Sequence, residues 1–271
     1  MQLTTLAILA LIQGITEFLP VSSSGHLILF PQLTGSEDQG LALDVAVHFG
    51  TLFAVMIFFR DDVAKLFAGG FDILRARFST PNARLAFLMI IATIPVIILG
   101  VTLKLTGTID QLRSIRTIGW AMLVFGIVLF WFDKHGSTER TAVGWNLRDA
   151  IIMGLWQAVA LIPGTSRSGA TITGARQLGF NRHDGAKLAM LMSIPTILAS
   201  VTLIGLDILS SDEPLPLRDL SVAAGLSFLA ALLALRLMMK FLNAYSLTPY
   251  VIYRVILGAV LIGLSYTSGY M

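Results

Sequence analysis

The sequence predicts an all-α polytopic membrane protein with about six transmembrane helices and two re-entrant helix-turn-helix hairpins. The first observation behind this prediction is composition, because only 13% of the 271 residues are charged while 55% are hydrophobic. A soluble domain of this length needs far more charged surface. The second observation is a set of six uninterrupted apolar stretches. The third is a pair of apolar segments that are broken by Pro, Ser and Gly.

Each uninterrupted stretch approaches the length of about 20 residues that crosses the hydrocarbon core once. The stretches fall at 41–59, 85–104, 117–132, 187–207, 220–240 and 249–269. We expect a helix over each, with the lipid bilayer around the chain. The absence of cysteine excludes disulfides and thiolate chemistry. Basic residues are dispersed without forming a stripe, so no nucleic acid is expected as a partner.

The two broken segments cover about 3–33 and 149–178. Their interruptions read LPVSSSG at 19–25 and IPGTSRSG at 162–169. Irregular backbone at membrane depth is tolerated only where protein or a water-filled cavity satisfies its polar groups. Each segment is therefore expected to form a helix, a turn and a second helix that line an internal site.

The distribution of Lys and Arg predicts the orientation in the membrane, because cytoplasmic loops carry the excess of these residues. Thirteen of the 19 belong to the linker 60–84, the flanks of the second broken segment and the region 236–247, whereas four lie on the opposite side. Both termini are then extracytoplasmic. The first hairpin opens outward and the second opens toward the cytoplasm.

The chain also shows a weak internal repeat. A shift of 144 positions superposes the broken segments, which indicates pseudo-repeats of about 1–133 and 134–271 within one integral membrane domain, 1–271. Corresponding breaks in two halves are typical of inverted-repeat folds with a site at the repeat interface. Chance is the alternative, because few positions match. The identical pairs are Gln13 and Gln157, Ser22 and Ser166, Ser24 and Ser168, and Gly25 and Gly169.

Glu17 is the one acidic residue with long apolar sequence on both sides. An ionisable group at such depth is costly and marks a functional site by default, and a cleavable leader would not contain it. Gln13 lies four residues earlier, on the same helix face. We interpret Glu17 as a carboxylate that holds a divalent cation or handles a proton. The alternative is a neutral Glu17 that is hydrogen-bonded to Gln13 between helices.

Three serines at 22–24 precede Gly25 and His26 at the start of a new apolar run. Serines at a helix start are commonly caps, which is the structural alternative. A hydroxyl beside an imidazole is also the usual pairing for nucleophilic catalysis. Ser23 and His26 are therefore candidate catalytic residues. His48, within the first uninterrupted stretch, faces either a partner helix or the same cavity.

Arg167 lies among small hydroxyl residues where the second broken segment resumes as a helix. Its planar guanidinium can bind phosphate through two hydrogen bonds, and a helix start adds free N–H groups and a positive dipole end. We predict an anion site here. If both helix starts point at one anion, the groups of the two hairpins suit phosphoryl transfer. The alternative is a structural Arg that binds neighbouring carbonyls.

At these residues the sequence resembles the BacA-type undecaprenyl-diphosphatases of bacterial membranes. The first motif of this family, Gln or Glu followed four residues later by Glu, is met by Gln13 and Glu17. The second, Pro-Gly-x-Ser-Arg-Ser-x-x-Thr, is met in full at 163–171. The resemblance covers the whole chain and includes TPYVIYR at 248–254. Gln13 takes the neutral option of the first motif, which leaves Glu17 as its only carboxylate.

The resemblance implies hydrolysis of undecaprenyl diphosphate to undecaprenyl phosphate and inorganic phosphate at the outer face of the bacterial cytoplasmic (inner) membrane. This reaction recycles the lipid carrier for peptidoglycan synthesis and is associated with bacitracin resistance. The resemblance also implies Mg²⁺, with Ca²⁺ as the alternative and Glu17 as the metal ligand, and it is compatible with a homodimer. It implies catalytic roles for Glu17, Ser23, His26 and Arg167, and diphosphate-binding roles for Gln13, Ser166, Arg167, Ser168 and Thr171.

The residues leave the nucleophile open among Ser23, His26 and a water positioned by Glu17. They also leave open a second class of function, an inverted-repeat transporter or flippase for a phosphorylated lipid. Such a protein needs the same anion site but no nucleophile. A purely structural membrane component would give Glu17 and Arg167 no reason to lie at that depth.

Overall fold

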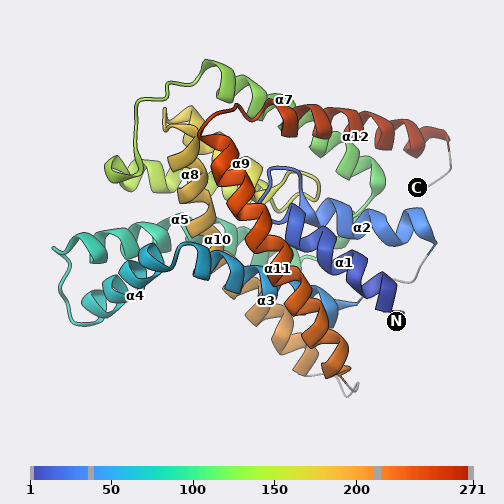
Figure 1. Ribbon diagram of the computed structural model, residues 1–271, viewed down its shortest axis with the longest axis horizontal. Helices are drawn as coiled ribbons and strands as arrows, with labels where there is room; N and C mark the ends of the chain where they lie inside the picture. Colours follow the sequence, from blue (N-terminus) through green and yellow to red (C-terminus); the bar gives the residue numbers. More distant parts are fainter. Residues whose placement is uncertain (1–2, 36–39, 210–214, 268–271) are drawn as a thin grey trace.

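The computed structural model describes residues 3–35, 40–209 and 215–267 (Figure 1). Within these ranges the chain is helical and has no β-strand, only an isolated bridge between Arg140 and Phe180. The elements are α1 (Leu3–Thr16), α2 (Ser23–Thr34), α3 (Leu41–Phe58), α4 (Arg60–Leu74), α5 (Pro81–Leu105), α6 (Thr108–Gln111), α7 (Ile115–His135), η1 (Ala142–Gly144), α8 (Leu147–Val159), α9 (Arg167–Gln177), α10 (Arg182–Leu209), α11 (Leu217–Leu242) and α12 (Thr248–Thr267).

Six of these helices, α3, α5, α7, α10, α11 and α12, are long and apolar enough to cross a membrane. Each overlaps one predicted stretch, so the prediction of an all-α, multi-pass membrane protein is confirmed. The last two residues of the sixth predicted stretch, 268 and 269, lie outside the described ranges. Each broken segment forms two helices around a turn, α1 and α2 in the first and α8 and α9 in the second.

The linker 60–84 contains a helix that the sequence analysis did not predict. α4 follows α3 directly and carries two Asp residues in its first turn, where they complement the helix dipole. Its charged residues and paired glycines distinguish it from the uniformly apolar stretches. Gly69 allows α4 to lie close to the start of α5, because a Cβ at this position would overlap the backbone of Asn82.

Each broken segment packs on a spanning helix from the other half of the sequence (Figure 1). α1 packs on α11, which crosses the middle of the molecule and also packs on α3, while α8 packs on α5. The close approach occurs at Gly14 for α1 and α11 and at Gly154 for α8 and α5. Glycine permits these backbone contacts because it has no Cβ. α7 and α12 lie side by side and form a further pair that joins the halves.

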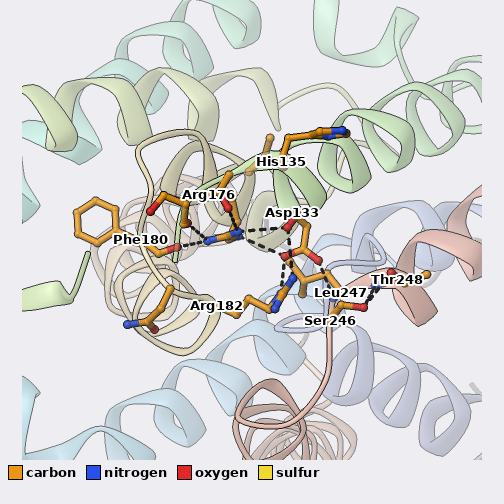
Figure 2. Close-up of polar contacts among 12 residues, drawn as sticks. Asp133, His135, Arg176, Phe180, Arg182, Ser246, Leu247 and Thr248 are labelled. Carbon is orange, nitrogen blue, oxygen red and sulfur yellow. Dashed lines mark hydrogen bonds and ion pairs between the residues drawn. The ribbon is translucent and has the colours of Figure 1, made fainter. Parts of the chain in front are cut away.

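Four helix ends meet at a buried cluster around Asp133, which Figure 2 shows. The carboxylate of Asp133 accepts hydrogen bonds from Arg176 Nε at 3.2 Å, Arg182 Nε at 2.7 Å and the Leu247 N–H at 3.1 Å. Arg176 is fully buried. It also donates to the backbone carbonyls of Asp133, Gly136, Ser137 and Phe180. The cluster joins the ends of α7 and α9 to the starts of α10 and α12, and so determines where α9 lies.

Candidate active site

The two broken segments make the same turn. Ser22 and Ser166 both have a positive φ, 75° and 71°, which is uncommon for a residue with a Cβ. Each caps the helix that follows, since Ser22 Oγ accepts from the Gly25 N–H at 3.3 Å and Ser166 Oγ from the Gly169 N–H at 3.1 Å. Strained backbone of this kind persists only where the surrounding structure holds it, and it is common at functional sites. The starts of α2 and α9 are therefore built alike.

The carboxylate of Glu17 contacts groups from both hairpins. Its Oε1 accepts from Arg167 Nη2 at 2.5 Å, and its Oε2 accepts from the Ser23 hydroxyl at 2.6 Å and from Gln13 Nε2 at 2.8 Å. Glu17 is only 6% exposed, so these charge-assisted hydrogen bonds are shielded from bulk water. The structure brings together four predicted site residues, Gln13, Glu17, Ser23 and Arg167.

His48 on α3 faces the same carboxylate. Its Nδ1 donates to the carbonyl of Asp44 at 2.7 Å, and its Nε2 lies 3.9 Å from Glu17 Oε2. Of the two orientations that the sequence left open, the structure has the one that points toward the site.

His26 makes no hydrogen bond to Ser23 in the described part of the chain. Its Nδ1 donates to the carbonyl of Ser22 at 2.6 Å, and its Nε2 lies 2.5 Å from the hydroxyl of Tyr253. The rings of His26 and Tyr253 stack with their planes 8° apart. A carbonyl can only accept, so in a neutral imidazole Nε2 is the acceptor and Tyr253 the donor. The hydroxyl of Ser23 thus has Glu17, and not His26, as its acceptor.

The predicted hydroxyl residues of the second hairpin are engaged in hydrogen bonds within the protein. Ser168 donates to the carbonyl of Leu19 at 2.9 Å, which ties the second hairpin to the turn of the first. Ser166 Oγ lies 3.1 Å from Ser168 Oγ, and Thr171 donates to the carbonyl of Arg167 at 2.8 Å. These contacts hold the backbone around Arg167. Their part in binding a diphosphate stays a prediction.

Arg254 on α12 joins the two turns. Its guanidinium donates to Gly164 and Thr165 in the second turn, at 3.2 and 2.8 Å, and to Pro20 in the first, at 3.4 Å. The carbonyl of Ala121 on α7 is a fourth acceptor, at 3.5 Å. All four acceptors are backbone carbonyls, and Arg254 has no carboxylate partner among the described residues. Burial of an unpaired charge is costly. Arg254 therefore adds a positive charge where both turns meet.

Two buried polar atoms beside Glu17 have no partner within the described ranges. They are Arg167 Nη1 and Gln13 Oε1. Arg167 therefore keeps an N–H donor that its bond to Glu17 does not use, and Gln13 keeps an oxygen that can accept a hydrogen bond. A buried donor without an acceptor costs about 1–3 kcal/mol. A phosphate oxygen bound at Arg167 Nη1 would remove this cost.

The donor set at Glu17 is small for a metal site. No group of three or more His, Cys, Asp or Glu side chains suited to a metal ion occurs among the residues that the structure describes. Glu17 offers a carboxylate, and Gln13 Oε1 offers an amide oxygen that has no hydrogen-bond partner among the described residues. Mg²⁺ is usually bound by one or two carboxylates together with substrate phosphates. These residues fit a cation that binds together with a diphosphate.

The sequence pattern assigns no role to Tyr253 or Arg254, although both belong to the segment TPYVIYR. An arginine within an apolar span is itself a signal of function. Tyr253 carries no such signal, because a tyrosine near a membrane interface is ordinary. Its contact with His26 joins positions 227 residues apart, and only the fold brings them together.

A family model described as "Bacitracin resistance protein BacA" matches residues 6–260, which include both hairpins and α12 up to Val260. The chain belongs to the BacA family. The undecaprenyl-diphosphatase of Jannaschia sp. (strain CCS1) is 60% identical over 266 residues. Those of Ruegeria pomeroyi and Roseobacter denitrificans are 58% and 55% identical over 267 residues. Each alignment covers 98% of this chain and 100% of the relative. The family resemblance identified from the two motifs is confirmed.

Proposed function

We propose that this BacA-family protein hydrolyses undecaprenyl diphosphate to undecaprenyl phosphate and inorganic phosphate. Its relatives named above are undecaprenyl-diphosphatases. The observation that carries the proposal is the contact of Ser23 and Arg167 with the two oxygens of Glu17. Phosphoryl transfer requires a positioned nucleophile, a proton acceptor and positive charge at the phosphate. These three residues supply them.

Arg167 has the donors to hold substrate and Glu17 at once. Nη2 binds Glu17 and Nη1 has no partner among the described residues. A terminal phosphate that accepts from Nη1 would lie near the Ser23 hydroxyl, because both groups belong to residues that contact the same carboxylate. The N–H groups at the start of α9 support the same charge.

In the proposed reaction, Ser23 Oγ attacks the terminal phosphorus and its proton passes to Glu17 Oε2, 2.6 Å away. The bond from this phosphorus to the bridging oxygen breaks, and undecaprenyl phosphate leaves with the electron pair. Water then attacks the phosphoserine. Glu17 returns its proton to Ser23 Oγ, and the proton that the water loses stays with the released phosphate.

We propose that His26 donates a proton to the bridging oxygen of the leaving group. Its ring is held on one side by the carbonyl of Ser22 and on the other by the hydroxyl of Tyr253. In its protonated form this imidazole can give the Nε2 proton to the bridging oxygen as the bond to phosphorus breaks, and it regains a proton from solvent after undecaprenyl phosphate has left. His26 and Tyr253 form a proton-carrying pair separate from Ser23 and Glu17.

A divalent cation, Mg²⁺ or alternatively Ca²⁺, would be held by Glu17 and Gln13 Oε1 together with the diphosphate. When bound, it neutralises charge on the phosphate oxygens. Arg167 and the start of α9 bind the same oxygens from the protein side.

We propose that the protein lies in the bacterial inner membrane with its site facing the extracytoplasmic side. Its reaction would supply the lipid carrier for peptidoglycan synthesis and contribute to bacitracin resistance. The excess of Lys and Arg at the opposite end of the molecule supports this orientation.

The matching turns at Ser22 and Ser166 support two pseudo-repeats of about 1–133 and 134–271 with inverted topology. A homodimer is the oligomeric state that we propose to test.

Purified protein in proteoliposomes that contain undecaprenyl diphosphate tests the proposal. We expect release of inorganic phosphate together with formation of undecaprenyl monophosphate, and a dependence on divalent cation in a chelator arm. A transporter or flippase would move the lipid across the bilayer with its diphosphate intact. Movement without phosphate release, at every cation concentration, would reject the phosphatase.

A further inference from the structure

A cavity of about 930 Å³ lies where α4, the start of α5, the segment 142–145 and the start of α10 meet. None of the residues of the candidate active site lines it. The cavity lies at the end of the spans where Lys and Arg are concentrated. It is thus a separate feature at the opposite end of the molecule from the outward-opening hairpin.

The charged lining of this cavity is mainly basic. Lys65, Arg84 and Lys187 line it against a single carboxylate, Asp62. Asp62 is engaged by Lys187 at 2.8 Å and by Lys65 at 3.5 Å. Arg84 is exposed and has no side-chain hydrogen bond or ion pair in the described part of the chain. The cavity therefore has positive charge that the protein itself does not neutralise.

Neutral donors accompany these charges. Ser79 and Asn82 line the cavity at the start of α5, whereas the hydroxyl of Thr80, which also lines it, donates to Asp72 Oδ2 at 2.7 Å. Trp145 also lines it and is buried, and its indole N–H has no partner within the described ranges. An anion with several acceptor oxygens suits such a lining, and a phosphate has them.

Apolar side chains lie beside the polar lining. Phe78 and Phe87 line the cavity and are 64% and 45% exposed. On α4, Phe67, Phe71 and Leu74 recur at the spacing of one helix face and are more than half exposed. Aromatic and basic residues together at the end of membrane spans are typical of the headgroup level, where lipid chains begin.

We propose that this cavity binds the phosphate of an anionic glycerophospholipid. The free guanidinium of Arg84 and the ammonium groups of Lys65 and Lys187 attract the headgroup. Phe78 and Phe87 contact the start of its acyl chains. Basic pockets between spans on the cytoplasmic side bind anionic headgroups in this way.

Native mass spectrometry of the detergent-purified full chain tests this site. Wild type is titrated with phosphatidylglycerol, phosphatidylcholine and inorganic phosphate. The cavity variant combines Lys65→Gln and Arg84→Gln. The matched control combines Arg75→Gln and Arg77→Gln, which make the same charge change at exposed positions of the same linker outside the cavity.

We expect wild type to bind phosphatidylglycerol about tenfold more tightly than phosphatidylcholine. The cavity variant should lose this preference and the control should keep it, with phosphate release from undecaprenyl diphosphate within about twofold of wild type in both. Equal weakening in both variants would overturn the proposal, because it would show general charge attraction. Absence of a lipid preference in wild type, or displacement of the lipid by millimolar inorganic phosphate, would overturn it as well.

Discussion

The guanidinium of Arg167 donates to Glu17 Oε1 at 2.5 Å across 150 residues of sequence. The ion pair joins the turn after α1 to the first residue of α9. Both side chains are largely buried, and loss of one partner from a buried pair commonly costs about 3–5 kcal/mol because the other charge is left uncompensated. Neither hairpin can therefore form the site alone.

Ser23→Ala should lower kcat for phosphate release by about a thousandfold or more, because it removes the proposed nucleophile while leaving Glu17 and Arg167 in place. Ser24→Ala is the matched control, since Ser24 is exposed and its side chain has one hydrogen bond within the described ranges, to Ser22 Oγ at 3.4 Å. It should stay within a few-fold of wild type. A loss of less than tenfold in Ser23→Ala would transfer the nucleophile's role to His26 or to water.

Arg254→Met should lower kcat/KM by about a hundredfold with a small change in thermal stability. The substitution removes the hydrogen bonds that join the two turns, but it also removes an unpaired buried charge, and these effects on stability oppose one another. Arg254→Lys keeps the charge without the planar donor fork and should be intermediate. Wild-type activity in Arg254→Met would show that the turns hold their positions without this side chain.

Asp133→Asn should destabilise the protein by about 3 kcal/mol or more, because it leaves Arg176 and Arg182 without their shared carboxylate (Figure 2). For a chain of this size the unfolding temperature in detergent should fall by roughly 6–12 °C. Asp61→Asn is the control, because the side chain of Asp61 is 89% exposed and its contact with Arg60 is weak. Similar unfolding temperatures for both variants would contradict a structural role for the Asp133 cluster.

The spans and the two hairpins could be predicted from the sequence because hydrocarbon imposes a simple rule on length and polarity. α4 could not, since it is amphipathic and owes its position to contact with α5 at Gly69. The burial of Asp133 could not be predicted from the sequence either. Asp133 lies at the end of a span, where a charged residue is normally exposed to solvent. Its carboxylate is buried because the end of α9 and the start of α12 fold back onto it.

At the site, the residue types were predictable and their pairings were not. The motifs contain Gln13, Glu17, Ser23 and Arg167, and the structure brings these four together. Adjacency in sequence favoured His26 as the partner of Ser23, yet the helical turn from Ser22 directs the His26 ring to Tyr253 on α12. A partner so distant in sequence leaves no local pattern.

The rate of phosphate release from undecaprenyl diphosphate by purified Arg167→Ala tests the central claim, that both hairpins form one phosphatase site, most directly. Arg148→Ala is the control, since Arg148 is an exposed residue of the same hairpin. We expect kcat/KM to fall by about a thousandfold or more in Arg167→Ala, about 4 kcal/mol of transition-state stabilisation, with Arg148→Ala within twofold of wild type. A wild-type rate in Arg167→Ala, or an equal loss in both variants, would contradict the claim.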